Sequence, residues 1–420
     1  MASVSSPGRK RVLYLTYDGL TDPIGRSQVL PYLNGCAAAG HRLTVVSFEK
    51  KAAMARLGSQ VGAELKQAGI AWHPERFRTR PPLLAKWLDQ RAMARAARAL
   101  GAEGPDLIHA RSYVAGMAGL QVARTSGIPL LFDMRGLWVD QRREGGRWTD
   151  DRLLGRTLYR RWKANERALV GGAAHIVTLT AAARDEVSSW PHFPRVPVSV
   201  IPCCADFSLF RPAEARERTA ARARLGIPQD ALVLAHLGSL GTVYLTVELL
   251  RLFGMIAARR PLSRLLLIGN HDRSELLSLA RGHGIEIKPE MLVVTAADRE
   301  QVSATLGAGD AGACLIMPTY SSIGVSATKV GEYLACRLPV FANKGVGDIE
   351  PLLGATAGHL LSDTSDASLG AAAEAFVRQE FHSPATVRDR ALPLLDLKLA
   401  VEAYANIYAR PGERVELVRW

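Results

Sequence analysis

The sequence predicts an α/β protein with two Rossmann-like, doubly wound parallel-sheet domains that face each other across a cleft. Short apolar runs rich in Val, Ile and Leu recur along the chain, and continuous apolar runs are typical of strands buried on both faces of a parallel sheet. Amphipathic stretches long enough for helices separate these runs. This alternation occurs twice in the 420 residues, once in each half.

The apolar runs place ten strands, five in each half. They are expected at 11–16, 42–48, 106–110, 129–134 and 175–180, then at 232–238, 264–269, 291–295, 311–317 and 338–342. Helices are expected at 151–169, 216–225 and 296–306, and also at 394–408, where apolar residues recur at helical spacing. The halves meet at a proline-bounded stretch near 201–212. We therefore expect one domain over 1–202, a second over 203–393, and a final helix within 394–420 that returns to the first domain.

Charge is distributed unevenly along the chain. Residues 1–200 carry 30 Lys and Arg against 16 Asp and Glu, whereas residues 201–420 carry 23 against 24. A basic half can mark a surface that meets anionic lipid or nucleic acid. A well-solvated, Arg-rich helical surface explains the same imbalance, and the sequence leaves both interpretations open.

Several features favour a cytoplasmic protein. Apolar residues make up 48% and charged residues 22%, which is ordinary for a globular chain. No apolar run is long enough to span a bilayer, and the polar N-terminus does not have the pattern of a signal peptide. The five cysteines lack metal-ligand or redox spacing, so we expect reduced thiols. Peripheral docking on the inner face of the cytoplasmic membrane stays open.

The loop after the first expected strand, residues 17–28, joins a buried strand to a helix that begins near Ser27. Gly25 permits close approach of the backbone to a ligand, and the amino end of a helix attracts anions. The loop matches neither the dinucleotide fingerprint nor a P-loop. An ordinary strand-to-helix turn is the alternative.

Residues 320–340 predict a polar loop, a short helix and a strand. Ser326 or Thr328 is expected to cap the helix, whose free amides would suit a diphosphate. Lys329 adds a positive charge there, and Glu332 lies on the same helical face. A carboxylate one turn from a phosphate site could accept hydrogen bonds from ribose hydroxyls. A surface Lys–Glu pair explains the spacing equally well.

Two further groups of polar residues follow expected strands. In parallel sheets, ligand-binding residues come from the carboxyl ends of the strands, and His109, Arg111, Asp133 and Arg135 occupy such positions. Arginine suits phosphate and carboxylate groups, whereas a lone histidine is more often structural. The second group is a glycine-rich turn after the first strand of the second half, whose amides could meet a phosphate. It contains Gly238, Ser239 and Gly241.

Together these segments resemble the retaining glycosyltransferases of family 4, which have the two-domain GT-B fold. The resemblance covers nearly the whole chain in order. Its most specific part is Lys329 followed by Glu332-Tyr333-Leu334-Ala335 and Leu338-Pro339-Val340. Earlier landmarks are Asp18-Gly19-Leu20-Thr21-Asp22-Pro23, the stretch 133–138, and Ile201-Pro202 with Asp206.

The resemblance implies an enzyme that moves a hexosyl-type sugar, with retention and without a metal or cofactor, from a nucleoside-diphosphate sugar to a hydroxyl acceptor. The acceptor would be a growing polysaccharide or a glycolipid, an anionic membrane would be a partner, and nucleic acid would not. The first domain would hold the acceptor and the second the nucleotide sugar. The resemblance implies donor-binding roles for Gly25, Gly238, Ser239, Gly241, Ser326, Thr328, Lys329 and Glu332, and catalytic roles for His109, Arg111, Asp133 and Arg135.

Three positions depart from the family pattern. Gly324 stands where a second Glu is frequent, eight residues before Glu332. The stretch 241–244 lacks the usual basic pair, and Arg337 stands where Gly is common. A GT-B nucleotide-sugar epimerase or hydrolase is therefore one alternative function. A catalytically inactive nucleotide-binding or membrane-scaffold module is another.

Overall fold

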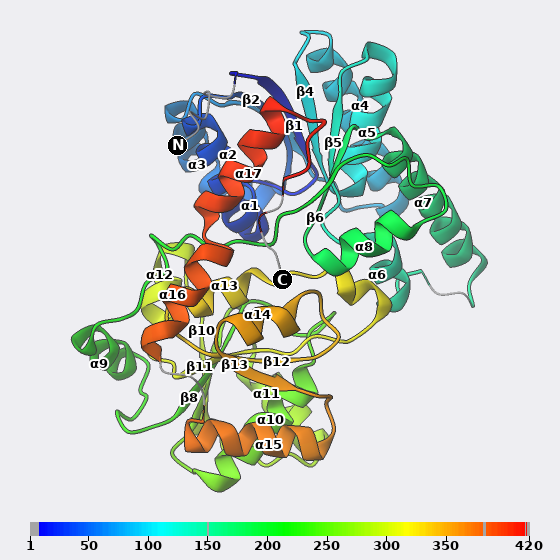
Figure 1. Cartoon of the computed structure of the whole chain (residues 1–420). Helices are drawn as coiled ribbons and strands as arrows, with labels where there is room; N and C mark the ends of the chain where they lie inside the picture. The colour runs from blue at the N-terminus through cyan, green and yellow to red at the C-terminus, as the bar shows by residue number, and fades with distance from the viewer. Residues whose placement is uncertain (1–7, 149–150, 381–383, 416, 418–420) are drawn as a thin grey trace. The chain divides into compact units, whose positions relative to one another are not determined.

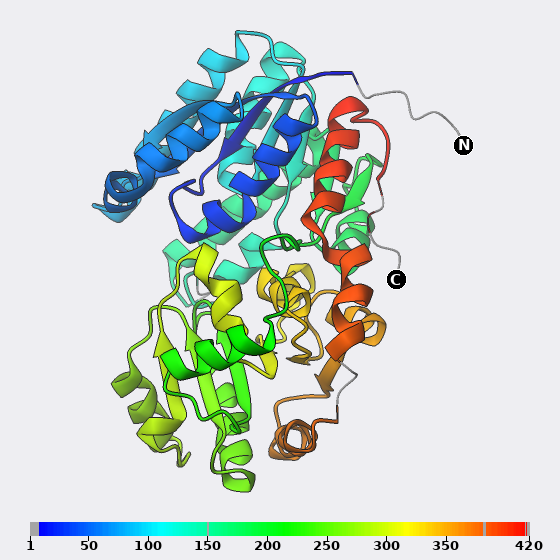
Figure 2. The ribbon, with the colours of Figure 1, turned by 90° about the vertical axis from the view of Figure 1, so that its left-hand side faces the viewer.

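The computed structural model describes residues 8–148, 151–380, 384–415 and 417, and they form two compact units. The first unit contains the chain up to Pro202 and the segment that begins at Leu397. The second unit runs from Cys203 to Asp396. Each unit has one parallel sheet with helices on both faces (Figure 1, Figure 2).

The sheet of the first unit has seven strands in the order β3-β2-β1-β4-β5-β6-β7, all parallel. The strands are β1 (Arg11–Thr16), β2 (Arg42–Glu49), β3 (Ala71–Arg76), β4 (Leu107–Arg111), β5 (Leu130–Asp133), β6 (His175–Thr178) and β7 (Val198–Val200). The order turns back after β1, so the carboxyl ends of β1 and β4 form the point where such sheets bind ligands.

Helices cover both faces of this first sheet. Figure 1 shows α4, α5 and α7 on one side, and α2, α3 and α17 on the other. The helices are α1 (Pro23–Gln28), α2 (Leu30–Ala38), α3 (Lys51–Gln67), α4 (Pro82–Gly101), α5 (Ser112–Ser126), α6 (Trp138–Glu144), α7 (Leu153–Gly172), α8 (Ala181–Ser189) and α17 (Leu397–Ala409).

The second unit has a six-stranded parallel sheet in the order β10-β9-β8-β11-β12-β13. Its strands are β8 (Val233–Leu237), β9 (Arg264–Ile268), β10 (Leu292–Thr295), β11 (Ala311–Cys314), β12 (Val340–Asn343) and β13 (Gly358–Leu361). Its helices are α9 (Ala215–Arg224), α10 (Thr246–Arg259), α11 (Arg273–Gly282), η1 (Pro289–Met291), α12 (Arg299–Leu306), η2 (Tyr320–Gly324), α13 (Thr328–Ala335), α14 (Ile349–Ala355), α15 (Asp366–Arg378) and α16 (Pro384–Leu395).

The core of the second unit lies on both faces of its sheet. Val233, Ala235 and Leu237 of β8 belong to one apolar cluster, and Leu234 belongs to a cluster on the opposite face. This two-residue alternation follows from the geometry of a strand. Because both faces are covered, the strand is apolar throughout, and this continuous apolar run is what predicts the strand from the sequence.

All ten expected strands are present, but the sequence missed three others, β3, β7 and β13. Each lies at the edge of its sheet. β3 is half exposed and contains Pro74, β7 has three residues, and only the last residue of β13 is fully buried. A partly exposed edge strand such as β3 or β13 does not need a continuous apolar run, whereas β7 is buried but too short to produce one.

The C-terminal helix differs from the expectation for 394–408. It is divided at Asp396 into α16, which belongs to the second unit, and α17, which belongs to the first. The five cysteines are all buried thiols. Among the described residues, no helix combines the length and the apolar character that a membrane span requires.

Candidate functional site

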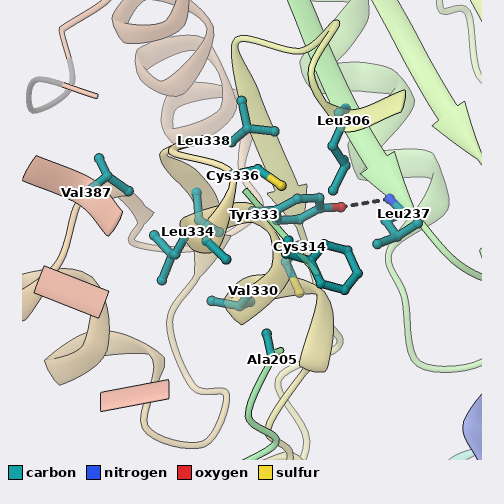
Figure 3. Packing of buried hydrophobic residues seen from close by; sticks show 14 of the residues in the cluster. Ala205, Leu237, Leu306, Cys314, Val330, Tyr333, Leu334, Cys336, Leu338 and Val387 are labelled. Carbon is teal, nitrogen blue, oxygen red and sulfur yellow. Dashed lines mark hydrogen bonds between the residues drawn. The ribbon is translucent and has the colours of Figure 1, made fainter. Parts of the chain in front are cut away.

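A buried tyrosine fixes α13 against the ends of two strands. The Leu237 amide of β8 donates to the Tyr333 hydroxyl at 2.7 Å, and that hydroxyl donates to the Ala313 carbonyl of β11 at 3.4 Å. Figure 3 shows the Tyr333 ring within the apolar cluster beside Leu306 and Cys314. Gly312 permits this position, because a Cβ there would lie 2.3 Å from the ring. Lys329 and Glu332 of α13, the two residues predicted to bind the nucleotide sugar, are therefore held at the carboxyl edge of the sheet.

Lys329 of α13 is a cation in a nearly dry environment. It is 7% exposed, and its Nζ lies 3.7 Å from the centroid of the Tyr244 ring and 3.3 Å from Nε2 of His236. Among the described residues, no carboxylate forms an ion pair with it. Burial lowers the pKa of Lys329 to about 8, although Glu332 opposes the change. A buried ammonium group without a paired carboxylate is suited to an anion.

His236 stays neutral beside this lysine. Burial, and then the charge of Lys329, lower its pKa to about 3, against contacts with two carbonyls. Those carbonyls belong to Ala313, 3.2 Å from Nδ1, and Ser239, 3.1 Å from Nε2. At neutral pH the positive charge of this pair therefore resides on Lys329.

Glu332 lies one turn further along α13 and is 6% exposed. Its Oε1 is 3.5 Å from Nη1 of Arg299, a residue of α12 that the sequence did not single out. Burial raises the pKa of Glu332, while Arg299 and Lys329 oppose that shift. Lys329 and Glu332 are thus both buried, and the interpretation as a surface pair is wrong.

Ser326 and Thr328 do not cap α13 as expected. The N-cap residue is Ala327, and no side chain caps the helix. The Ser326 hydroxyl instead accepts a hydrogen bond from the Cys203 amide at 3.0 Å. Thr328 is the first residue of the helix, and its buried Oγ1 has no hydrogen-bond partner in the described structure. Thr328 is thus the one of the two whose hydroxyl is available at the helix start.

The glycine-rich turn after β8 shapes the backbone beside Lys329, but two of its amides are already used in hydrogen bonds within the protein. Gly238 and Gly241 have φ values of 88° and 72°, which favour glycine. Their amides already donate to the Ile268 carbonyl at 2.8 Å and to the Thr246 hydroxyl at 2.8 Å. The turn brings Gly238 next to Lys329, since a Cβ at Gly238 would lie 3.8 Å from Nζ.

The departures from the family pattern have structural counterparts. The ring of Tyr244, in the stretch without a basic pair, supports the Lys329 ammonium. His271, not singled out by sequence, lies beside the turn, with Nε2 2.9 Å from the Gly238 carbonyl. Arg337 follows α13 with a φ of 61°, a left-handed conformation that explains why glycine is favoured there. Gly324 is buried in η2.

His109 and Asp133 of the first unit lie beneath the last helix. Nδ1 of His109 is 2.7 Å from the Tyr408 hydroxyl, and the Tyr404 hydroxyl donates to Oδ2 of Asp133 at 3.2 Å. The His109 Nε2 atom is 3.6 Å from the same carboxylate oxygen, and both side chains are almost fully buried. The two tyrosine hydroxyls of α17 thus contact the His109–Asp133 pair directly.

The charges of this cluster are complementary. Burial lowers the pKa of His109, against the effect of Asp133. Burial alone would raise the pKa of Asp133, but Arg135, His109 and Arg111 together lower it. Asp133 is therefore ionised and His109 neutral at pH 7.

Arg111 and Arg135 converge on one side chain of the first loop. Their Nη2 atoms donate to Oε1 of Gln28 at 3.1 and 3.0 Å, and Nε of Arg111 lies 3.5 Å from Asp18. Gly25 of the same loop is required by the chain's own backbone, because a Cβ there would lie 1.9 Å from the Gly19 carbonyl oxygen. The expected close approach is thus to the loop itself.

Metal ligands do not cluster in the part of the chain described. Among those residues, no group of three or more His, Cys, Asp or Glu side chains is arranged to hold a metal ion.

Solved structures share the architecture of the whole chain. The HepE protein of Anabaena, solved in complex with UDP and glucose, aligns with a TM-score of 0.69 and 15% identity over 96% of this chain and 100% of its own. Sucrose-phosphate synthase from Thermosynechococcus elongatus aligns with a TM-score of 0.67 and 16% identity over 96% and 99%. The two parallel-sheet units define the GT-B fold.

Sequence comparison finds similarity to glycosyltransferases over parts of the chain. Residues 26–204 match the family model described as "Glycosyl transferase 4-like domain". D-inositol 3-phosphate glycosyltransferase 1 of Catenulispora acidiphila is 31% identical over 32% of this chain and 30% of its own, and the Arthrobacter enzyme is 26% identical over 57% and 54%. These alignments span about a third to a half of the relatives' lengths. The chain thus has the GT-B fold, and the part that resembles the family model lies almost entirely in its first unit.

Proposed function

We propose that this protein is a retaining glycosyltransferase of family 4 that moves a hexosyl-type sugar from a nucleoside-diphosphate sugar to a hydroxyl acceptor. One observation carries the proposal: α13 holds a buried ammonium with which no carboxylate of the described residues pairs and, one turn later, a buried carboxylate. A cation followed by a hydrogen-bond-accepting carboxylate matches the order of diphosphate and ribose in a nucleotide sugar. The relatives named as glycosyltransferases and the neighbour bound to UDP and glucose support the same donor class.

The proposed chemistry follows from charge. Departure of a nucleoside diphosphate builds negative charge on its phosphate, which fixed cations and amides stabilise without reorganisation. Lys329 would supply the cation, and the start of α13 with Thr328 would supply donors. Glu332 would accept hydrogen bonds from two ribose hydroxyls. In the proposed retaining route, the leaving phosphate oxygen accepts the acceptor proton, so no metal and no protein nucleophile take part.

Arg111 and Arg135 are the better candidates for contact with the acceptor or the transferred sugar. Their guanidinium groups meet at Gln28 of the first loop, whereas His109 and Asp133 already contact the hydroxyls of Tyr408 and Tyr404. We propose that His109 and Asp133 position the arginines through the charge of Asp133, which lies 3.8 Å from Arg135.

Replacement of Glu332 by Ala tests the donor site. We expect UDP affinity, measured by calorimetry, to fall at least about 10- to 100-fold, because each hydrogen bond to a charged group is worth about 1.5–3 kcal/mol. The matched control is Glu290→Ala, which removes an exposed carboxylate of the same unit. Equal affinities of the wild type and Glu332→Ala for both UDP and GDP would refute the assignment.

Product analysis tests the reaction. With a nucleotide sugar and an acceptor, NMR should detect a glycoside whose anomeric configuration equals that of the donor. An inverted product would refute retention. Turnover of the nucleotide sugar alone at the same rate would favour an epimerase or hydrolase, and binding without turnover would favour an inactive module.

We further propose that the acceptor is lipid-linked or a growing polysaccharide, and that the protein works at the cytoplasmic face of a membrane. The excess of Lys and Arg in residues 1–200 supports this location.

A further inference from the structure

We propose that the outward face of α4, with the first turn of α7, docks the first unit onto an anionic lipid bilayer. The inference deepens the proposed function by assigning its membrane contact to particular side chains. Its biological purpose rests on that function, since a lipid-linked acceptor lies at such a surface, but the docking itself depends only on this surface.

Three large apolar side chains project from the outward face of α4. Leu84, Trp87 and Leu88 are 48%, 49% and 37% exposed, and their spacing places them on one face of the helix. Arg91 and Arg95 continue this face, and the Arg91 guanidinium lies 4.4 Å from the centroid of the Trp87 ring. We call these five residues the α4 stripe.

The exposed charge of α4 is entirely positive. Its one acidic residue, Asp89, is fully buried and accepts hydrogen bonds from the Tyr17 hydroxyl at 2.7 Å and from Arg78 at 2.9 Å. The inward face also carries Ala85, Ala92, Met93 and Ala97. The helix therefore buries its only negative charge and leaves its arginines in solvent.

α7 repeats this arrangement. Leu153 and Leu154 in its first turn are 75% and 58% exposed. Its one acidic residue, Glu166, is 1% exposed and pairs with Lys163. The exposed cations of the helix are Arg156, Arg160, Arg161 and Arg167.

The apolar turns of the two helices lie at the same edge of the sheet. All strands of the first unit are parallel, so α4 and α7, which lead from one strand to the next, begin at its carboxyl edge. α5 packs against both helices, and Figure 1 shows the three on one side of the sheet. Burial lowers the pKa of Lys86 at this edge, as do the nearby cations Arg142 and Lys50.

An anionic bilayer fits this combination better than nucleic acid does. Interfacial helices carry Trp and Leu on the inserted face and Arg or Lys beside it, and Trp favours the headgroup level. Arginine can place its stem along apolar tails while its guanidinium reaches phosphate. Nucleic-acid surfaces need the cations but not two separate groups of exposed leucines.

Vesicle flotation of the full chain tests the proposal. Wild-type protein should float with vesicles of phosphatidylglycerol and phosphatidylcholine, and less with phosphatidylcholine alone. The triple variant Leu84→Ser, Trp87→Ser, Leu88→Ser should lose at least about tenfold in partitioning, because three apolar side chains no longer leave water. The apolar control is Leu262→Ser, an exposed leucine of the second unit.

Two further measurements define the mode of docking. Arg91→Gln with Arg95→Gln should weaken flotation and its salt dependence, whereas Arg259→Gln with Arg281→Gln should not. Brominated lipids should quench wild-type tryptophan fluorescence more than that of Trp87→Phe, because Trp87 enters the headgroup layer.

Several outcomes would overturn the proposal. One is a wild-type protein that does not float with anionic vesicles at low salt, and another is a triple variant that floats as well as the wild type. The other two are a wild-type dimer, or tight binding of the wild type to nucleic acid, that is lost in the triple variant. Failure of this proposal and failure of the proposed function can be distinguished, because different variants test them. Glu332→Ala should float like the wild type, and the triple variant should bind UDP like the wild type.

Discussion

At the scale of single residues, the candidate donor site depends on a lysine in an unusual environment. Lys329 is desolvated, yet an aromatic ring and a neutral imidazole surround it in place of a carboxylate. The electrons of an aromatic face attract and stabilise a cation, but they do not neutralise its charge. Such a group remains available to an anionic ligand, and the missing basic pair in 241–244 is no obstacle to phosphate binding.

The pKa of Lys329 gives a pH dependence with a defined sign. Its folded pKa, about 8, lies below the ordinary value of 10.5, so the ammonium is present below pH 8 and is lost above it. A diphosphate binds the charged form, so UDP affinity should fall as pH rises from 7.5 to 9.5, by up to about tenfold per pH unit above the pKa. Calorimetry across this range measures it.

Lys329→Met should weaken UDP binding at pH 7.5 about 10- to 100-fold, since a charge-assisted hydrogen bond is worth about 1.5–3 kcal/mol, and should flatten the pH profile. Lys288→Met, at an exposed lysine of the same unit, should keep both affinity and profile. A Lys329→Met protein with an undiminished pH dependence would assign the titration to another group.

At the scale of elements, α13 and α17 show how a helix is fixed at the end of a sheet. α13 is fixed by Tyr333 through β8 and β11. α17 is fixed by Tyr404 and Tyr408 above β4 and β5, and Gly35 of α2 permits its contact, because a Cβ there would lie 2.4 Å from Val401. In both elements, small residues let large aromatic or branched side chains approach closely.

Gly312→Ala should disturb the donor site through Tyr333. The new methyl group would meet the ring at 2.3 Å, and such overpacking costs about 1–3 kcal/mol. We expect a lower urea midpoint together with weaker UDP binding, because α13 must shift. Gly370→Ala in α15 meets no atom within 4 Å and should leave binding unchanged while adding about 0.5–1 kcal/mol of stability. Equal behaviour of the two variants would contradict the role of Tyr333.

At the scale of the whole molecule, buried neutral histidines couple stability to pH. Burial lowers the pKa values of His109, His175 and His236 below their ordinary value of 6.5. The unfolded chain therefore binds more protons than the folded chain as pH falls below 6.5. Stability from these groups is fully present above pH 6.5 and is lost progressively below it.

Urea unfolding at pH 7.5 and pH 5 should show this loss, about 1.4 kcal/mol for each histidine and each pH unit between its two pKa values. His236→Asn should reduce the difference between the two pH values, although it lowers stability at pH 7.5. His192→Asn, at an exposed histidine, should not change the difference. Identical pH dependence in both variants would show that other groups dominate.

The sequence by itself determined the fold class and most of the sheet. Strands such as β1 and β8 are buried on both faces, so their apolar runs are visible without any structure. The edge strands β3 and β13 were missed because partial exposure places no such demand on composition, and β7 was missed because it has only three residues. Lys329 and Glu332 were found because a helix fixes the spacing of its own residues.

Only the tertiary structure decided what surrounds those residues. Arg299, His236, Tyr244 and His271 come from separate segments, and no local pattern links them to α13. The same holds for Tyr404 and Tyr408, which lie about 270 to 300 positions from Asp133 and His109 and contact them. Burial of the acidic residues of α4 and α7 was equally hidden. The sequence specifies the chemical type of each side chain, but contact, exposure and charge balance at a surface arise only when distant segments pack together.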